Sequence, residues 1–408
     1  EVAAMKLGLE NIRTLLNALG DPQNSYLKVQ VAGTNGKGSV CAFLGSICRE
    51  AGINTGIFTS PHLISVTERI QINGRDITED EFAIYAGKVR NAAEKLLAEG
   101  KLEYRPTFFE QITAIALTAF AEAGIRLAIL ETGLGGRLDA TTAARAEIAA
   151  ITQIDFDHQE YLGQTLTKIA SEKAAIIHDG SAVVVGGQNH EAGTLIRKRL
   201  AQLGIEARLG DDVSVEADGS GIRFKTAFEM YQAGRLGLAG RHQLENAKVA
   251  ILVAETLKGH FPISSQDIID GLENARHPGR LEYQGRYLFD GAHNIGGATA
   301  LVNYLKEFEK RSITIVFGAM RDKEIAEIAT ILFPLAARIV LTEPENSRSQ
   351  SYEELLEQIP DDISRLNVFA ADSVEKALTI AETMTPDDGI ILVTGSLYLV
   401  GEVKQVLV

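Results

Sequence analysis

Residues 29–39 (Val-Gln-Val-Ala-Gly-Thr-Asn-Gly-Lys-Gly-Ser) combine residue types and a spacing that suit phosphate chemistry. A short β-branched run stops at a glycine-rich turn with one lysine, and apolar residues with helical spacing follow. Glycines let backbone N–H groups approach phosphate oxygens, and the N-terminus of a helix adds unpaired donors and a partial positive charge. Lys37 supplies a point charge, and the Ser39 hydroxyl is placed to reach a magnesium ion. The segment therefore predicts a site for a nucleoside triphosphate.

The segment departs from the general P-loop pattern at two positions. Val31 stands where that pattern has its first glycine, and Gly38 separates the lysine from the hydroxyl residue. The alternative interpretation is a tight turn between strand and helix that needs glycine only for a positive φ. We favour the triphosphate site.

Carboxylates follow three other apolar runs. Glu131 ends a strand-like run, where a magnesium ligand belongs in a phosphate-binding sheet; the alternative is a solvated strand end. Asp157 and His158 follow a second run, and Asp290 and His293 follow a third. An acid and an imidazole at the carboxyl end of a strand suit metal binding or proton transfer, although a lone histidine in a loop is often structural.

Lys173 lies on a helix that we expect to begin near Leu166, with apolar residues around it. In apolar surroundings a lysine can lose its proton and become reactive. This segment alone favours a surface lysine whose aliphatic stem lies along the core.

The composition is that of an ordinary globular protein: 408 residues, 45% hydrophobic and 23% charged, long enough for two or three domains. The net charge of −14 argues against nucleic acid as a partner, which needs a basic stripe. No apolar run approaches the roughly 18 residues that cross a bilayer, so we expect no membrane span. Cys41 and Cys48 face the same side of one expected helix as core thiols, which suits a reducing compartment and a cytoplasmic location.

Strand-like and helix-like segments alternate along the chain, which predicts an α/β fold with mainly parallel sheets. Asn73-Gly74 is a hairpin signal, and residues 213–238 have the glycine turns of short antiparallel strands. In this first part we expect strands at 28–32, 56–59, 127–131, 148–154 and 182–185, and helices at 79–97, 109–123 and 243–258.

The alternation restarts after residues 277–280 (His-Pro-Gly-Arg), which have the composition of a linker. Here we expect strands at 287–290, 313–317, 338–341 and 390–393, with helices from 296, 323 and 352 and a final helix. That is enough for an independent sheet. The predicted architecture is a P-loop ATPase-type N-terminal domain, 1–280, with a mainly parallel sheet, and a Rossmann-like C-terminal domain, 281–408.

These clusters together resemble the Mur ligase superfamily and, within it, the folylpolyglutamate synthase/dihydrofolate synthase family. The loop Gly-Thr-Asn-Gly-Lys-Gly-Ser at 33–39 is a hallmark of that family, so its departures from the general P-loop are the family's own pattern. The matches occur in the family's order and span most of the chain. They include 59–62, 109–110, 131–141, 157–158, 162–163, 172–177, 240–247, 278–280 and 290–294.

The resemblance implies a role for each matched position. The residues that would contact ATP are Thr34, Asn35, Gly36, Lys37, Gly38, Ser39, Asn246, Arg280 and Asp290. Those that would hold Mg²⁺ are Ser39, Ser60, Glu131 and His158. Those that would lie towards a pterin-bearing substrate are Phe109, Glu110 and Asp139. The catalytic residues would be Lys37, His158, Lys173 and His293.

Lys173 also matches the lysine that this family carboxylates with CO2, and the resulting carbamate would support the metal site. Two positions depart from the family's pattern. His277 stands where many relatives have tryptophan, and Ala175 stands where glycine is common.

The resemblance implies an ATP-dependent ligase that joins L-glutamate to a folate-type carboxylate through an acyl phosphate. The acceptor would be tetrahydrofolate, dihydropteroate or both. We expect a monomer whose partners are ATP, L-glutamate and the pterin or folate substrate. One alternative is another Mur-type ligase acting on cell-wall precursors, which needs a UDP-binding domain where only residues 1–32 precede the loop. The other is a nucleotide switch, although the chain has no Asn-Lys-x-Asp guanine signature.

Overall fold

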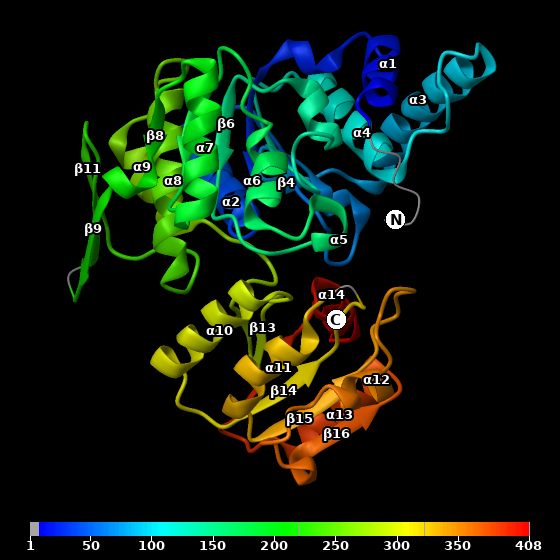
Figure 1. Ribbon diagram of the computed structural model, residues 1–408, viewed down its shortest axis with the longest axis vertical. Coiled ribbons are helices and arrows are strands. Elements are labelled where there is room, and N and C mark those ends of the chain that lie inside the picture. The colour runs from blue at the N-terminus through cyan, green and yellow to red at the C-terminus, as the bar shows by residue number, and fades with distance from the viewer. Residues whose placement is uncertain (1–7, 220, 322, 408) are drawn as a thin grey trace. The chain divides into compact units, whose positions relative to one another are not determined.

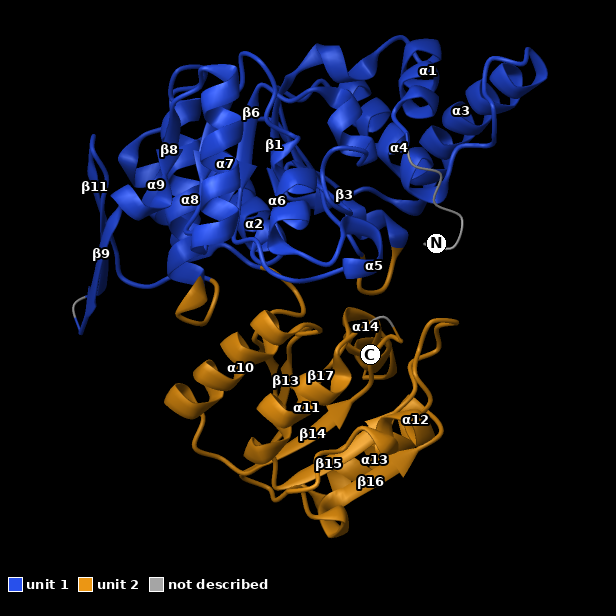
Figure 2. Cartoon of the chain, viewed as in Figure 1, with its two compact units in different colours: residues 1–61, 66–237, 243–276 blue, residues 62–65, 238–242, 277–408 orange. Residues whose placement is uncertain are grey.

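The computed structural model describes residues 8–219, 221–321 and 323–407, and Figure 1 draws it as ribbons. The chain forms two compact units (Figure 2). Unit 1 contains the described residues within 1–61, 66–237 and 243–276, and unit 2 contains those within 62–65, 238–242 and 277–408. Residues 277–280 thus belong to unit 2. The assignment of separate tasks to the domains 1–280 and 281–408 stays a prediction.

Unit 1 is built on a large, mainly parallel sheet. Its eight strands are β1 (Leu27–Ala32), β2 (Thr55–Phe58), β3 (Ile70–Ile72), β4 (Arg75–Asp76), β5 (Leu127–Glu131), β6 (Ile148–Ile151), β7 (Ala182–Val185) and β8 (Ala207–Leu209). They lie in the order β4-β3-β2-β5-β1-β6-β7-β8, in which β3 and β4 form an antiparallel hairpin and the others pair in parallel. The central strands are apolar runs because helices cover both of their faces.

The helices of unit 1 cover the two faces of this sheet (Figure 1). These helices are α1 (Glu10–Ala18), α2 (Lys37–Glu50), α3 (Glu79–Ala98), α4 (Phe108–Glu122), α5 (Gln159–Leu162), α6 (Leu166–Ala174), α7 (His190–Leu203), α8 (His242–Leu257) and α9 (Ser265–Asn274). Leu130 packs against α1, α3 and α4, and Ala149 packs against α6 and α7. Both residues are register partners of Gln30, so their side chains point to the same face of the sheet. These five helices therefore cover one face. Ile57 is the register partner of Ile129 and contacts α2 at Gly45, which puts α2 on the other face.

A small second sheet in unit 1 consists of β9 (Ser214–Asp218), β10 (Gly221–Lys225) and β11 (Met230–Ala233). The strands are antiparallel in the order β11-β10-β9, and β11 packs against α9. The short antiparallel strands expected in residues 213–238 are confirmed.

Unit 2 is a doubly wound α/β unit. Its strands are β12 (Glu282–Gln284), β13 (Tyr287–Phe289), β14 (Ile313–Phe317), β15 (Arg338–Thr342), β16 (Val368–Ala371) and β17 (Ile390–Thr394), in the order β12-β13-β17-β14-β15-β16. All pairs are parallel except β12 with β13. One apolar cluster joins the sheet to α10 (Ile295–Phe308), α11 (Ile325–Leu332) and α12 (Tyr352–Glu357), and a second joins it to α13 (Val374–Met384) and α14 (Leu397–Val406).

Most of the expected elements are present, together with several helices and strands that were not expected. The hairpin at Asn73-Gly74 is confirmed, and both residues have the positive φ angles, 53° and 77°, that a tight hairpin turn requires. The elements that were not expected are the helices α1, α5, α7, α9 and α13 and the strands β8, β12 and β16. The helix expected from Lys323 begins at Ile325. β8 and β16 are edge strands of their sheets, and edge strands often have too few apolar residues to be recognised in the sequence.

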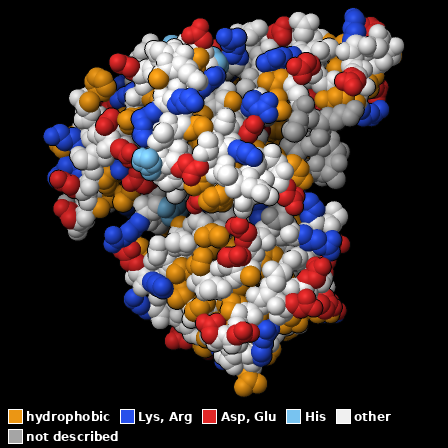
Figure 3. Space-filling model, in the orientation of Figure 1, with side chains coloured by type: hydrophobic (Ala, Val, Ile, Leu, Met, Phe, Trp, Pro, Cys, Tyr) orange, Lys and Arg blue, Asp and Glu red, His pale blue; other side chains and the backbone are white. Residues whose placement is uncertain are grey.

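The cysteines and the surface agree with the composition. Cys41 and Cys48 are free, buried thiols. Among the described residues, no helix is both long enough and apolar enough to span a membrane. Acidic and basic side chains are interspersed on the face drawn in Figure 3.

Candidate active site

The turn between β1 and α2 requires glycine because of two close approaches. A Cβ on Gly33 would lie 1.8 Å from Thr152 Oγ1. A Cβ on Gly36, which has a φ of +89°, would lie 2.1 Å from Asn246 Oδ1. Neither position can hold a larger side chain unless its neighbour moves. These glycines are therefore required by close packing as well as by their positive φ.

The loop 33–36 is fastened to the segment that follows β6. Thr34 Oγ1 donates to Asp155 O at 2.9 Å and accepts from Asp155 N at 3.0 Å. The backbone N–H groups of Thr34 and Asn35 both donate to Gln153 O, at 2.8 and 3.3 Å. Lys37, the first residue of α2, donates from Nζ to Thr34 O at 3.2 Å, so its ammonium group lies at the loop.

Lys173 is not the surface lysine that its segment favoured. Its side chain is buried, at 3% exposure, and Nζ donates to Gly33 O at 2.7 Å. Burial and, to a smaller extent, the charge of Lys37 lower the pKa of Lys173 to about 7, although the charges of Asp157 and Asp139 oppose this shift. A large fraction of the amine is therefore neutral near pH 7, with a free electron pair on nitrogen.

Glu131 and Ser60 form a contact at the carboxyl end of β5. The backbone N–H of Ser60 donates to Glu131 Oε2 at 3.1 Å. Glu131 is 5% exposed, so the solvated strand end is excluded. Its register partner in β1 is Val31, which places this carboxylate beside the strand that leads into the glycine loop. A buried carboxylate at this place suits a divalent cation with oxygen ligands.

His158 lies in a different local setting. It has a left-handed backbone (φ 49°) where the chain enters α5, and its Nε2 lies 3.7 Å from Asp157 Oδ2. Within the described ranges, no three or more His, Cys, Asp and Glu side chains form a group that could hold a metal ion. The set expected to hold Mg²⁺ has only two such side chains, Glu131 and His158, beside two serines.

The pKa of the Cys41 thiol, in α2, is affected by two charged side chains. Burial raises its pKa, the charge of Glu131 raises it further, and the charge of Lys37 lowers it. Both charges therefore act at one position of α2. The structure brings together the lysine and the carboxylate that the sequence places 94 residues apart.

The two residues expected near a pterin, Phe109 and Glu110, begin α4. Thr107 and Glu110 form a capping box: the Thr107 N–H donates to Glu110 Oε2 at 2.8 Å, and the Glu110 N–H donates to Thr107 Oγ1 at 3.3 Å. The other oxygen of Glu110, Oε1, is buried and has no hydrogen-bond partner among the described residues. The ring of Phe109 lies so close to Gly133 that a Cβ there would be 2.5 Å from it.

Asp139 holds the glycine-rich loop that follows β5. Its Oδ2 accepts from the N–H groups of Gly133 and Leu134 at 2.8 and 2.9 Å, and its Oδ1 accepts from the Thr141 N–H at 3.0 Å. Burial raises its pKa, and these hydrogen bonds counter the shift. Both oxygens are engaged by the loop, so Asp139 has a structural task. Its contact with a substrate stays a prediction.

Gln243 is a site residue that the sequence did not single out. Gly38 and Ser39 lie in the first turn of α2, and Gln243 Nε2 donates to Ser39 Oγ at 3.2 Å. Asn246 Nδ2 in turn donates to Gln243 Oε1 at 2.9 Å. The spacing of three residues on a helix was the available signal, because it puts Gln243 and Asn246 on one face of α8.

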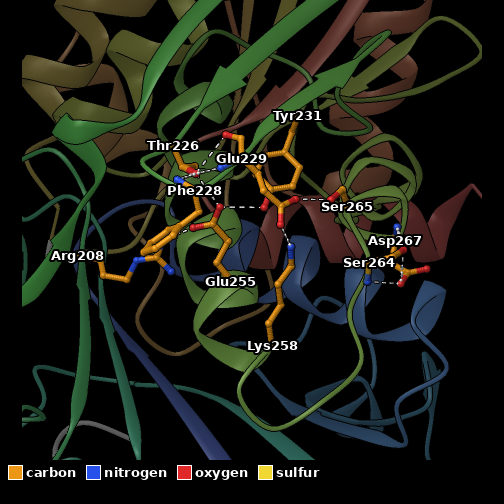
Figure 4. Close-up of polar contacts among 10 residues, drawn as sticks. All are labelled: Arg208, Thr226, Phe228, Glu229, Tyr231, Glu255, Lys258, Ser264, Ser265 and Asp267. Carbon is orange, nitrogen blue, oxygen red and sulfur yellow. Dashed lines mark hydrogen bonds and ion pairs between the residues drawn. The ribbon is translucent and has the colours of Figure 1, made fainter.

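Figure 4 shows how the far end of α8 is anchored. Glu255 Oε1 accepts from Thr226 Oγ1 at 2.7 Å and from the Tyr231 hydroxyl at 2.8 Å, and its other oxygen pairs with Arg208. Beyond the helix, Lys258 pairs with Glu229 at 2.6 Å. One end of α8 is thus tied to β8 and the small sheet, while its first turns contact the glycine loop.

Arg280, Asp290 and His293 lie in unit 2, near the end of β13. Asp290 accepts from the N–H groups of Leu281 and Ala292, both at 3.0 Å. Burial raises the pKa of Asp290, and the charge of Arg280 opposes the shift. His293 Nδ1 lies 2.8 Å from Gly291 O. Their contact with ATP stays a prediction.

Two family models match the chain. The Mur ligase middle domain matches residues 31–254, and the Mur ligase glutamate ligase domain matches residues 279–397. The first covers the large sheet of unit 1 with its glycine loop. The second covers most of unit 2.

Curated relatives match over nearly the whole chain. A dihydrofolate synthase/folylpolyglutamate synthase of Bacillus subtilis is 34% identical over 98% of this chain and 95% of its own length. A probable bifunctional folylpolyglutamate synthase/dihydropteroate synthase of Haloferax volcanii is also 34% identical over 98% of this chain, but the chain spans only 48% of that relative. The chain thus spans about half the length of the haloarchaeal relatives it matches.

Solved structures also match over nearly the whole chain. The folylpolyglutamate synthase of Mycobacterium tuberculosis with ADP and AMPPCP has a TM-score of 0.91 at 29% identity, over 98% of this chain and 95% of that one. A bifunctional folylpolyglutamate synthase/dihydrofolate synthase with Mn, AMPPNP and L-glutamate bound has a TM-score of 0.86 at 28% identity, over 99% of this chain and 95% of that one.

Proposed function

The chain belongs to the Mur ligase family, in its folylpolyglutamate synthase/dihydrofolate synthase branch, and from this premise we propose that it joins L-glutamate to a folate-type carboxylate with cleavage of ATP. The observation that carries the proposal is the glycine loop of β1 and α2, with Lys37 at its end and the buried carboxylate of Glu131 beside it. A phosphate chain at this loop would meet backbone N–H groups, a lysine and a cation site.

The chemistry explains why such a site is needed. A carboxylate is a poor electrophile, because its charge repels an amine and an oxide is a poor leaving group. A carboxylate oxygen of the acceptor attacks the γ-phosphorus of ATP, ADP leaves, and an acyl phosphate forms. The amine of L-glutamate then attacks the acyl carbon, loses a proton and expels phosphate. The task of Lys37 is to neutralise charge on the transferred phosphoryl group.

A divalent cation fits the residues present. Ser39, Ser60 and Glu131 offer oxygen donors, and His158 offers an imidazole nitrogen, which together are acceptable ligands for Mg²⁺ or Mn²⁺. When bound, such an ion neutralises phosphate charge. The buried carboxylate of Glu131 at the carboxyl end of β5 supports this assignment, because carboxylate oxygens are the ligands that Mg²⁺ prefers.

We further propose that Lys173 is carboxylated. The electron pair of its neutral amine attacks the carbon of CO2, and the nitrogen loses a proton to give a carbamate anion. The lowered pKa of Lys173, about 7, supports this step because only the neutral amine reacts. The carbamate would carry negative charge near Gly33 and Lys37, because Lys173 Nζ lies 2.7 Å from Gly33 O.

The remaining roles belong to the same proposal. Phe109 and the free Oε1 of Glu110 face the pterin-bearing substrate, while Asp139 shapes the loop beside it. Asn246, Arg280 and Asp290 contact ATP, and His293 lies close to it. The enzyme works as a monomer and without nucleic acid.

Phosphate release tests the proposal. The protein is assayed with ATP and Mg²⁺ while dihydropteroate, tetrahydrofolate and L-glutamate are added singly and in pairs. Release that needs a pterin acceptor and glutamate together supports the ligase, and the acceptor that works identifies which of the two reactions occurs. Release that is indifferent to both overturns the proposal in favour of a nucleotide switch. Release that requires a different acid acceptor overturns it in favour of another Mur-type ligase.

A further inference from the structure

Three side chains form a buried hydrogen-bonded row between α8 and α2. Ser39 Oγ accepts from Gln243 Nε2 at 3.2 Å, and Gln243 Oε1 accepts from Asn246 Nδ2 at 2.9 Å. Gln243 is 2% exposed, and Ser39 and Asn246 are 6% and 8% exposed. The proposed function assigns roles to the two outer residues, Ser39 and Asn246, and Gln243 connects them by hydrogen bonds.

The row has a defined direction. The Gln243 amide has an acceptor end and a donor end. Since Asn246 occupies the acceptor end with its own N–H, the donor end of Gln243 must face Ser39. Asn246 Oδ1 is then turned to Gly36, where no Cβ would fit. The orientations of the two amides are thus consistent with each other.

This direction determines what Ser39 can offer a ligand. A serine hydroxyl has two lone pairs and one hydrogen. One lone pair of Ser39 Oγ is taken by Gln243, which leaves the second lone pair and the hydrogen. A serine in the first turn of a helix can otherwise rotate towards a backbone group of its own turn. The contact with Gln243 opposes that rotation and keeps the oxygen at one place.

We propose that Gln243 is a positioning residue for the nucleotide-bound divalent cation, which it serves by holding Ser39 Oγ in place. The inference rests on the proposed function, in which Ser39 lies beside the triphosphate and the metal ion. Partners that hold a metal ligand in place typically contribute about 10- to 100-fold to metal affinity.

The competing explanation is that Gln243 is only a buried polar side chain whose loss weakens the fold. The two explanations differ in whether its effect needs Ser39. A positioning residue loses its effect on metal binding when the Ser39 hydroxyl is removed, whereas a general loosening of the fold persists. A double-mutant cycle between the two residues therefore separates the explanations.

The experiment measures Mn²⁺ binding to the ADP-saturated protein by electron paramagnetic resonance, with no folate or glutamate present. The variants are Gln243→Met, which keeps length but has no donor, Ser39→Ala and the double variant. Gln23→Met is the matched control, because Gln23 is also a buried glutamine of unit 1, and it lies in the turn after α1. Circular dichroism and thermal unfolding verify that each variant folds, and Gln243→Leu replaces Gln243→Met if the latter does not.

We expect Gln243→Met to weaken Mn²⁺ binding about 10- to 100-fold, Gln23→Met to leave it within twofold, and the Ser39→Ala background to reduce the effect of Gln243→Met to less than about twofold. The inference is overturned if a folded Gln243 variant binds Mn²⁺ as the parent does, or if its effect is equally large without the Ser39 hydroxyl. Because no acceptor is present, a chain with this coupling but without folate-dependent phosphate release keeps the inference and loses the proposed function.

Discussion

Lys173 and Lys37 donate to consecutive carbonyl groups of one loop. Lys173 Nζ lies 2.7 Å from Gly33 O, and Lys37 Nζ lies 3.2 Å from Thr34 O. Burial is the main reason that Lys173 yields its proton more easily, and the positive charge of Lys37 adds to this effect. The buried Lys173 is therefore partly neutral near pH 7.

Stability should depend on pH through Lys173. Its pKa falls from 10.5 to about 7 on folding, so between these values the unfolded chain binds one more proton than the folded one. The free energy of unfolding then rises with pH, by up to about 1.4 kcal/mol per pH unit in that window. Urea denaturation from pH 7 to pH 10 in CO2-free buffer should show this rise in the parent and its absence in Lys173→Met.

The matched control for this series is Lys168→Met, because Lys168 lies on the same helix and is exposed. It should keep the pH dependence of the parent. If Lys173→Met and the parent had the same dependence on pH, Lys173 would titrate normally in the folded protein.

Carboxylation of Lys173 predicts a spectroscopic signal. With 13C-labelled bicarbonate at pH 8, the parent should give a carbamate resonance in its 13C spectrum, because most of the amine is then neutral. Lys173→Met should lack this resonance, and Lys168→Met should retain it. A resonance of equal intensity in all three proteins would place the carbamate on other amines, such as the N-terminus.

Local sequence patterns were enough to predict the strands and the loop that contain the candidate site residues. Runs such as 127–131 and 148–151 appear as strands because they are apolar and end at polar residues. Residues 33–39 are the loop between β1 and the first turn of α2, because glycine and lysine positions encode a turn and a helix start.

The sequence could not indicate features that depend on contacts between residues far apart in the chain. The segment around Lys173 alone favoured a surface lysine, because the carbonyl that accepts its hydrogen bond, Gly33 O, is 140 residues away in the sequence. Gln243 was overlooked for the same reason, since its partner Ser39 is 204 residues away. The cap at Glu110 is local, but whether its second oxygen meets a partner is a matter of tertiary packing.

Removal of the Lys37 charge should slow catalysis far more than it weakens folding. Its ammonium group is half-buried at the loop, and loss of a preorganised charge donor typically costs about 10²- to 10³-fold in kcat. Lys37→Ala should show that loss in phosphate release at saturating substrates, with a denaturation midpoint near that of the parent. Lys198→Ala, which changes an exposed lysine of α7, should release phosphate at the parental rate. Near-normal turnover of Lys37→Ala would contradict the proposed role.

Gly36→Ala should damage the nucleotide site through one contact. The new Cβ would meet Asn246 Oδ1 at 2.1 Å, and a φ of +89° adds strain of about 1–2 kcal/mol for a residue with a Cβ. Gly20→Ala is the matched control, because Gly20 has a φ of +83° with no atom within 4 Å. Gly20→Ala should lose only the strain energy and bind ADP normally, whereas Gly36→Ala should bind ADP at least tenfold more weakly, which is about 1.4 kcal/mol.

A second substitution separates the clash at Gly36 from the backbone strain. Asn246→Ala removes the atom that the new Cβ would meet. In that background Gly36→Ala should lower the free energy of unfolding by no more than Gly20→Ala does, because only the strained φ remains. Since Asn246 is itself assigned to ATP, the comparison uses urea denaturation without nucleotide. An equally large loss in both backgrounds would show that the packing of Asn246 against Gly36 does not determine the glycine at this position.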